Sequence, residues 1–215
     1  MILTFKETAD QKVYVTSDWH YNHQQEFVWK SRGFSSVEAH NKAIIDNCNK
    51  YVRENDILFN LGDLILNSTI VQFEELLSQI KCQNMYMLFG NHANRHYKEI
   101  YIPLVKERLG RNYTPDAELY PIRYRNVIYI GHYAEIRVNK QYAILSHYPL
   151  YSWNYIRKNS YMLHGHEHSG VKNHLPEGTD NKILDLSWDY FKKPVSFVEI
   201  QEIMNKKKIT GYGHH

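Results

Sequence analysis

Five short clusters of Asp, Asn and His side chains stand between residues 18 and 168. They are Asp18-Trp19-His20-Tyr21-Asn22-His23, Gly62-Asp63, Gly90-Asn91-His92, Ser146-His147 and Gly165-His166-Glu167-His168. Asp18 and His20 are two residues apart, so on extended backbone their side chains point to the same side, as a chelate requires. A single Asp-x-His is weak, because an Asp that caps a turn beside a surface His explains it as well. Five such clusters together indicate a metal site.

Seven side chains of these clusters are candidate ligands, and they combine hard oxygens with borderline nitrogens. The set is Asp18, His20, Asp63, Asn91, His147, His166 and His168. It is too large for one tetrahedral zinc ion, and it contains neither the thiolates of a soft-metal site nor the all-oxygen cage of calcium or magnesium. The set favours two divalent ions roughly 4 Å apart that share a carboxylate and leave a position open for water or substrate.

Parallel strands are the elements that would bring the first three clusters together. Apolar runs over 13–15, 57–61 and 85–89 predict buried strands that end just before Asp18, Asp63 and Asn91. Helices are predicted between them, one from a capping box at Ser35 and Glu38 to residues 55–56, the other from a cap within 67–69 to residue 80. Alternating strands and helices are typical of a parallel sheet, in which functional groups gather at the carboxyl ends of the strands.

A second sheet is predicted in the C-terminal half, where the apolar pattern changes. A helix over 102–109 ends at Gly110, and the apolar segment 127–130 is predicted to open this sheet. The segments 134–138 and 142–145 then form a hairpin across Asn139-Lys140. A strand over 161–163 leads to the Gly-His-x-His cluster, and 183–186 and 195–200 are predicted as closing strands. We expect this sheet to be mostly antiparallel.

The composition predicts one globular domain over residues 1–215, with 43% hydrophobic and 14% aromatic residues. A net charge of +3 permits a phosphate-bearing substrate but indicates no strong nucleic-acid surface, and the lone basic run, Lys206-Lys207-Lys208, is interpreted as a solvated tail. Charges appear too early for a signal peptide, and no apolar run reaches the roughly 18 residues of a membrane helix. With only two cysteines, the chain is expected to be cytoplasmic. Its oligomeric state is left open.

The order Asp-x-His, Gly-Asp, Gly-Asn-His, His and Gly-His-x-His resembles that of the calcineurin-like metallophosphoesterases. The chain looks closest to the small, cap-less bacterial and phage branch, in which the first motif extends to Asp-x-His-x-x-His, as Asp18, His20 and His23 do. Asn41, Asn49 and the ending Asp189-Tyr190 are similar to that branch as well. The resemblance implies an α/β fold of the αββα sandwich type, with two mixed sheets flanked by helices.

The resemblance also implies a role for each ligand. Asp18, His20 and His168 would hold one metal, Asn91, His147 and His166 the other, and Asp63 would bridge them. A hydroxide that bridges the metals would attack phosphorus, and His92 would act as general acid at the leaving oxygen. Manganese is the metal expected first, with iron, zinc or nickel as alternatives.

Two positions depart from the protein-phosphatase branch of the family. Leu66-Asn67 stands where that branch has Asp-Arg, and Ala93 stands where it has Glu. A Ser/Thr protein phosphatase is therefore not expected, and His92 lacks the Asp that orients the acid in that branch. The chain also has no insertion large enough for a cap domain.

Four residues are predicted to contact a bound phosphate ester: His23, Arg32, Asn41 and Tyr148. For each the competing interpretation is an ordinary surface or structural role. The predicted activity is hydrolysis of small phosphodiesters, including nucleotide-like ones. The alternatives are a broad phosphomonoesterase and a non-catalytic scaffold of the same fold, against which the complete ligand set argues.

Overall fold

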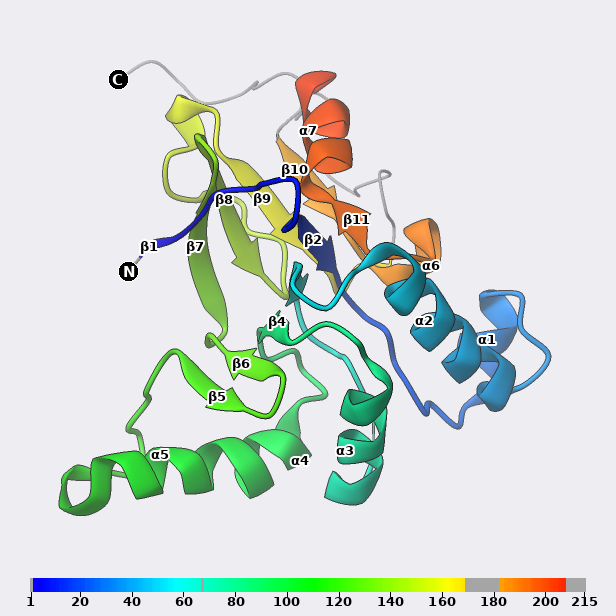
Figure 1. Ribbon diagram of the computed structural model, residues 1–215, viewed down its shortest axis with the longest axis vertical. Coiled ribbons are helices and arrows are strands. Elements are labelled where there is room, and N and C mark those ends of the chain that lie inside the picture. The colour runs from blue at the N-terminus through cyan, green and yellow to red at the C-terminus, as the bar shows by residue number, and fades with distance from the viewer. Residues whose placement is uncertain (1, 67, 169–181, 208–215) are drawn as a thin grey trace.

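Two β-sheets pack face to face in the computed structural model, which describes residues 2–66, 68–168 and 182–207 (Figure 1). The first sheet has the strand order β11 (Val195–Ser196), β2 (Val13–Thr16), β3 (Ile57–Asn60), β4 (Asn84–Met87), β6 (Val127–Tyr129) and β5 (Ile122–Tyr124). The second has the order β1 (Ile2–Phe5), β7 (Tyr133–Val138), β8 (Gln141–Ser146), β9 (Tyr161–His164) and β10 (Ile183–Asp185). Both sheets mix parallel and antiparallel pairs, and helices flank them, which confirms the predicted fold class.

Alternation along the central strands divides the apolar residues between two cores. Val13 and Val15 of β2 face the second sheet, whereas Tyr14 packs against the helices. In the same way Phe59 of β3 lies between the sheets and Leu58 lies under the helices. The four strands β2, β3, β4 and β6 are parallel to one another, so their carboxyl ends share one edge.

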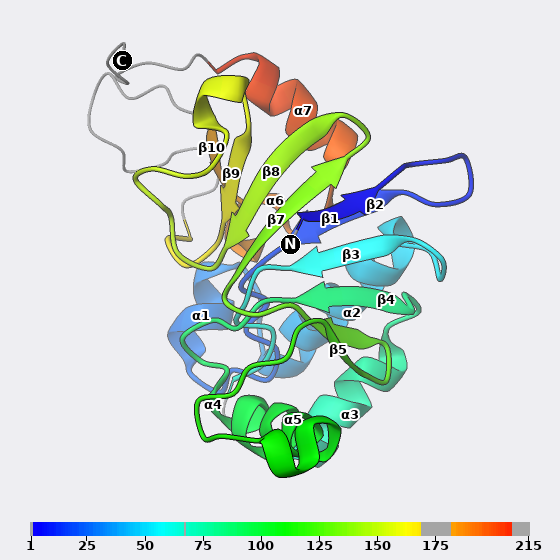
Figure 2. The ribbon, with the colours of Figure 1, turned by 90° about the vertical axis from the view of Figure 1, so that its left-hand side faces the viewer.

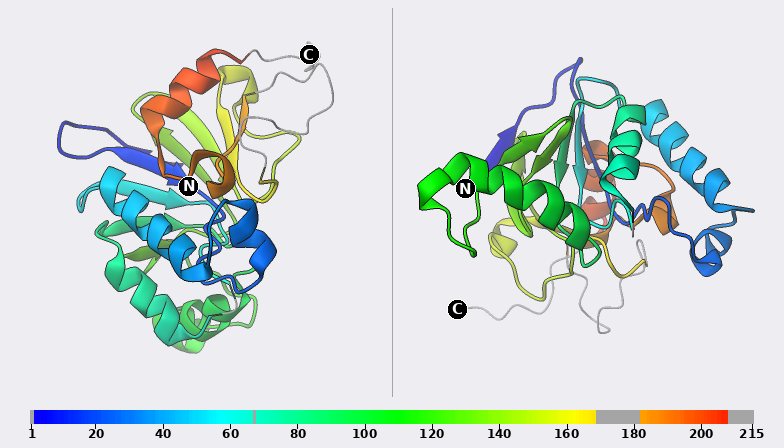
Figure 3. Two further views of the ribbon diagram at one scale, coloured as in Figure 1. Left: turned by 90° about the vertical axis from the view of Figure 1, so that its right-hand side faces the viewer. Right: turned by 90° about the horizontal axis from the view of Figure 1, so that it is seen from below.

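Helices cover the outer face of the first sheet, as Figure 3 shows for α2 (Val37–Tyr51), α3 (Ile70–Gln79) and α5 (Ile102–Leu109). The chain enters α5 through α4 (Asn94–His96) and a π-helical stretch (Tyr97–Tyr101), and leaves it through a 3₁₀ turn (Gly110–Asn112). Thr69 and Gln72 form a capping box at the start of α3, as expected. Asn67 lies outside the described residues.

The start of α2 differs from the prediction by one residue. Ser36, not Ser35, is the N-cap, and its side chain accepts a hydrogen bond from the backbone N–H of Ala39. Glu38 therefore does not occupy the third helical position that a capping box needs. A short helix α1 (Glu26–Ser31), which the sequence analysis did not predict, precedes it.

The second sheet is mostly parallel, so the expectation of a mostly antiparallel sheet was wrong. The hairpin at Asn139-Lys140 joins β7 and β8 as predicted, but β1–β7, β8–β9 and β9–β10 are all parallel pairs. A tight turn fixes only its own antiparallel pair, whereas the other pairs join segments remote in the sequence. The assignment of the segment 127–130 to this sheet was also wrong, because β6 pairs with β4 in the first sheet.

The predicted closing strand over 195–200 was also wrong beyond its first two residues. After β11 the chain forms α7 (Phe197–Asn205), with a capping box between Ser196 and Glu199. Phe197, Ile200 and Met204 share one helical face, which packs into the core between the sheets. The short helices α6 (Trp188–Phe191) and a 3₁₀ turn (Ile156–Lys158) complete the described elements.

No helix within the described ranges is long and apolar enough to cross a membrane. The assignment of the whole chain to one domain stays a prediction.

Candidate metal centre

The candidate ligands gather where the carboxyl ends of strands from both sheets meet. Asp18 and His20 follow β2, Asp63 follows β3 and Asn91 follows β4. His147 follows β8, and His166 and His168 follow β9. In Figure 2 the arrowheads of β3, β4 and β8 point toward the same region. The parallel order thus turns clusters that are remote in sequence into neighbours, as predicted.

One group of ligands is formed by Asp18, His20 and His168, whose ligand atoms lie within 4.8 Å of one another. Nε2 of His20 lies 3.7 Å and Nε2 of His168 lies 3.6 Å from Oδ1 of the fully buried Asp18. The other oxygen, Oδ2 of Asp18, accepts hydrogen bonds from the backbone N–H of His166 (2.9 Å) and the hydroxyl of Ser187 (3.1 Å). One carboxylate oxygen is therefore anchored while the other faces the two imidazoles.

A second group surrounds Asp63, beside the first. Oδ2 of Asp63 lies 3.4 Å from Nε2 of His147, and the same ring nitrogen lies 2.8 Å from Oδ1 of Asn91. Nδ1 of His166 is 3.1 Å from that amide oxygen. Asp18, Asp63 and His147 also place one ligand atom each within 4.8 Å of one another. The two groups are thus contiguous.

Three motif positions require glycine because the loops that carry the candidate ligands lie in contact with one another. A Cβ atom on Gly90 would lie 2.1 Å from Oδ1 of Asp63, and one on Gly165 would lie 2.1 Å from Oδ2 of Asp18. Gly62 has φ +120°, and a Cβ there would lie 2.6 Å from Nδ1 of His147. No side chain fits at these contacts, so the motif glycines bring the loops close enough for the ligands to converge.

Several ligands adopt backbone conformations that L-residues rarely take. Positive φ angles occur at Asp18 (54°), His20 (47°), Asp63 (51°), His166 (71°) and His168 (55°). Such residues cost of order 1–3 kcal/mol each and cluster at functional sites. At these positions the left-handed backbone directs side chains that follow the strands toward the candidate metal centre.

Unpaired buried groups show that the donor set fits a cation. Oδ1 of Asp18 and both ring nitrogens of His20 are buried and have no hydrogen-bond partner among the described residues. Each such group costs about 1–3 kcal/mol unless something binds it. Burial alone would raise the pKa of Asp18, but His20 and the charges of His147 and His168 outweigh burial and hold that pKa well below its usual range. Burial would also raise the pKa of Asp63, but the hydrogen bond and the charge of His147 outweigh burial and lower that pKa.

Asp189 is a functional candidate that the sequence analysis quoted only as part of a family ending. Its Oδ2 lies 2.6 Å from Nδ1 of His168 and accepts a hydrogen bond from Arg32 at 2.7 Å. Burial opposes ionisation, but the contacts with His168 and Arg32 lower the pKa of Asp189 to about 2. Asp189 follows β10 just as the other clusters follow their strands, and this strand-end signal could have drawn attention to it.

Arg32, a predicted substrate contact, lies behind the ligands. It is 3% exposed, and Asp189, the backbone oxygens of Asp18 and Trp19, and His40 lie within 3.0 Å of its guanidinium nitrogens. All five N–H groups of the guanidinium are thus engaged. In this arrangement Arg32 supports the backbone that carries Asp18.

The other predicted contacts lie around the site. His23 is next to His20, with ring centroids 5.6 Å apart, and His92 has its Nε2 atom 3.9 Å from Oδ2 of Asp63. Tyr148 is half exposed, and its ring centroid is 4.5 Å from that of His166. Asn41 accepts a hydrogen bond from the backbone N–H of Asn22 at 2.8 Å, so its side-chain oxygen supports the loop of the first motif.

The fold and site together define a metal-binding α/β sandwich, and comparison with known proteins identifies its family. The family model "Calcineurin-like phosphoesterase" matches residues 11–193. The chain belongs to this family, which confirms the resemblance, and with its Asp and His groups it is a metal-dependent phosphoesterase.

One relative and one solved structure match most of the length of the chain. An uncharacterised protein of Methanocaldococcus jannaschii is 28% identical over 205 residues, which cover 93% of this chain and 95% of that protein. The crystal structure of a protein of unknown function from Aquifex aeolicus has a TM-score of 0.59 and 20% identity, covering 90% of this chain and 99% of that one. At this identity the likeness shows a shared fold.

Proposed function

We propose that the protein hydrolyses small phosphodiesters at a centre of two divalent metal ions, with manganese as the preferred metal. The observation that carries the proposal is the pair of contiguous ligand groups around Asp18 and Asp63, which contain buried, unpaired ligand atoms. Two ions held there would lower the pKa of a coordinated water and neutralise charge on the phosphate oxygens. We assign Asp18, His20 and His168 to one ion and Asn91, His147 and His166 to the other.

Asp63 is the carboxylate that we assign to both ions, and its hydrogen bonds support this choice. Oδ2 of Asp18 already accepts two hydrogen bonds, so only Oδ1 is left to bind a metal. Oδ1 of Asp63 accepts one, from the backbone N–H of His92 at 3.0 Å, and Oδ2 lies toward His147. Asp63 therefore keeps more lone pairs for metal binding than Asp18 does.

His92 is the group that we propose as proton donor to the leaving oxygen. Its side chain is 42% exposed, so it can reach a bound ester, and its backbone N–H is fixed to Oδ1 of Asp63. The ring thus stands at the open side of the ligand groups, next to His20, with ring centroids 5.7 Å apart. A donor here would protonate an oxygen that departs from phosphorus.

The preference for diesters rests on the cations near the site. Every donor of Arg32 is engaged by the protein, and Arg95 contacts Glu99 and the backbone oxygen of Ser68. The guanidinium of Arg32 therefore has no donor left for the second charge that a phosphomonoester carries, and the charge of Arg95 is paired with that of Glu99. A singly charged diester needs no such partner.

Hydrolysis of bis(p-nitrophenyl) phosphate, compared with that of p-nitrophenyl phosphate, tests the proposal. The protein is treated with a chelator and then supplied with Mn²⁺, Fe²⁺, Zn²⁺ or Ni²⁺ one at a time, and bound metal is measured by elemental analysis. We expect two ions per chain, no activity without metal, and a higher kcat/KM for the diester with Mn²⁺. One ion per chain at saturation would contradict the dinuclear centre, and a higher kcat/KM for the monoester would contradict the substrate class.

A further inference from the structure

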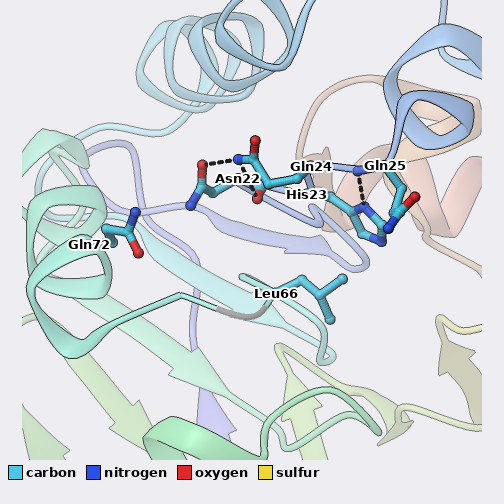
Figure 4. A pocket seen from close by; sticks show the side chains of 6 residues that line it. All are labelled: Asn22, His23, Gln24, Gln25, Leu66 and Gln72. Atoms are coloured by element: carbon cyan, nitrogen blue, oxygen red, sulfur yellow. Dashed lines mark hydrogen bonds between the residues drawn. The ribbon is translucent and has the colours of Figure 1, made fainter.

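A pocket of about 230 Å³ lies beside the metal centre, lined by Asn22, His23, Gln24, Gln25, Leu66 and Gln72 (Figure 4). Figure 4 shows Gln72 of α3 on one side and His23 on the other, with Leu66 and Asn22 between them. The volume is below that of a pocket for a drug-sized ligand, which begins at about 300 Å³, so it suits one small ring system.

The pocket is joined to the metal centre by two chain segments that run side by side. Beyond β2 and β3 the backbone stays paired, because His20 N–H donates to Asp63 O (3.0 Å) and Tyr21 N–H to Leu64 O (3.0 Å). One segment leads from His20 to His23 and the other from Asp63 to Leu66. The segment from His20 to His23 is a turn, since His23 N–H donates to His20 O (3.1 Å), and the ring centroids of these two histidines are only 5.6 Å apart. The pocket therefore lies directly against the proposed metal site.

The lining favours an uncharged ligand with donors and acceptors on one edge. Four of its six side chains are amides, and none is Lys, Arg, Asp or Glu. Amide side chains pair with the edges of heterocyclic bases through one donor and one acceptor. Nδ1 of His23 accepts a hydrogen bond from the backbone N–H of Gln25 at 3.2 Å, so Nε2 carries the proton of the neutral ring. Leu66 adds an apolar contact.

Hydrogen bonds hold the polar lining in place before any ligand binds. Asn22 has φ 61°; its backbone N–H donates to Asn41, and its side-chain oxygen accepts a hydrogen bond from Gln24 at 2.8 Å. Oε1 of Gln72 accepts from the backbone N–H of Thr69 at 2.9 Å in the capping box. The cap uses the oxygen of Gln72, and the amide nitrogen remains as a donor for the pocket.

An exposed aromatic ring stands next to the pocket. Phe27 is 69% exposed, and its ring centroid lies 5.9 Å from that of His23, with the planes at 72°. Proteins that bind single-stranded nucleic acids use aromatic side chains as platforms on which bases stack. Phe27 thus offers a face for a planar ligand whose edge the amides bind.

We propose that this pocket binds the nucleobase of a phosphodiester whose phosphate lies at the metal centre. The inference rests on the proposed function and names its substrate class, the nucleoside phosphodiesters. Gln72, His23 and Asn22 bind the edge of the base, and Phe27 stacks on its face.

Binding of nucleosides without phosphate tests the pocket separately from the chemistry. Calorimetry on the metal-loaded protein measures adenosine, guanosine, cytidine and uridine, with methyl ribofuranoside as the sugar control. Gln72→Glu keeps the capping box, since Glu is a usual residue at that position, but removes the amide donor and adds a charge. Gln83→Glu, at an exposed position before β4, is the matched control, and Phe27→Ala is a second variant that leaves the core intact.

We expect at least one nucleoside to bind, and Gln72→Glu and Phe27→Ala each to weaken that binding at least about fivefold while Gln83→Glu does not. Equal binding of the riboside, or nucleoside affinity unchanged in both variants, would overturn the inference. If the diester is hydrolysed but no nucleoside binds, the pocket assignment fails alone. If nucleosides bind as expected but no ester is hydrolysed, only the proposed function fails.

Discussion

Asp189 lies 2.6 Å from His168, and its contact is with Nδ1, the ring nitrogen that faces away from Asp18. The contact fixes the proton of the imidazole on Nδ1 and leaves the lone pair of Nε2 directed toward Oδ1 of Asp18, 3.6 Å away. Arg32 holds Asp189 from the other side through two hydrogen bonds. The orientation of the His168 ring therefore depends on Asp189 and, through it, on Arg32.

Asp189→Asn should weaken metal binding at the Asp18 group by about 10- to 100-fold, the usual cost of losing an outer partner of a ligating His. Competition with a chromogenic chelator gives the affinity independently of activity. Asp46→Asn, on the exposed face of α2, is the control for a lost carboxylate. An affinity equal to that of the wild type would show that Asp189 does not contribute to metal binding by His168.

Asp63→Asn should reduce kcat more than any other single ligand substitution does, since one change weakens the binding of both proposed ions. The fold should survive, because Asn keeps an oxygen for the hydrogen bond from the backbone of His92. Turnover and bound metal are measured together and compared with Asp18→Asn. Near wild-type turnover with two ions bound would refute the bridging role.

His92→Ala should leave metal content unchanged and slow esters with basic leaving groups by about 10²–10⁴-fold. Esters of p-nitrophenol should be affected far less, because their leaving group is stable as an anion. Rates for a series of esters of graded leaving-group pKa give a Brønsted slope for each protein. Parallel slopes would remove His92 from the acid role and leave it as an electrostatic contact.

His96→Phe should remove part of the pH dependence of stability. His96 is buried against Phe73, with ring centroids 5.2 Å apart, and burial lowers its pKa from 6.5 to about 4, although the charge of Asp63 opposes this. The unfolded chain therefore binds a proton near pH 6.5 that the folded protein refuses until about pH 4, and stability is lost as the pH falls through this range. At pH 5 the loss is about 2 kcal/mol.

Urea unfolding in the presence of a chelator, at pH 7.5 and at pH 5, measures this effect. The free energy of unfolding of the wild type should fall by about 2 kcal/mol more than that of His96→Phe. An equal fall in both proteins would mean that His96 is protonated in the folded state as readily as in the unfolded one.

The central strands and their ligands could be predicted because the signal is local. An apolar run that stops at Asp63 or Asn91 is visible within about ten residues, and alternating helices make the strands parallel. The convergence of Asp18 and Asp63 follows from that order alone. The same reasoning located the hairpin at Asn139-Lys140.

Pairings between remote segments could not be predicted in this way. Nothing in the sequence near Ile2 indicates that β1 pairs with β7. The hydrogen bond between Arg32 and Asp189 joins residues that are 157 positions apart in the sequence. Helix α7 is a different case, since the Ser196 and Glu199 capping box is visible in the sequence, but the apolar run that follows was interpreted as a strand. For residues 197–205 the capping box predicts the observed helix, whereas the apolar run was wrongly taken to predict a strand.

Gly90 cannot change without moving Asp63, since a Cβ atom at position 90 would lie 2.1 Å from Oδ1 of Asp63. A variant that replaces the glycine first must displace the carboxylate, and one that shortens the carboxylate first has already lost the proposed bridge. Every stepwise mutational route between this pair and a different one therefore passes through a protein with a damaged centre. A residue other than glycine at position 90 of a related chain is therefore expected together with a changed position 63.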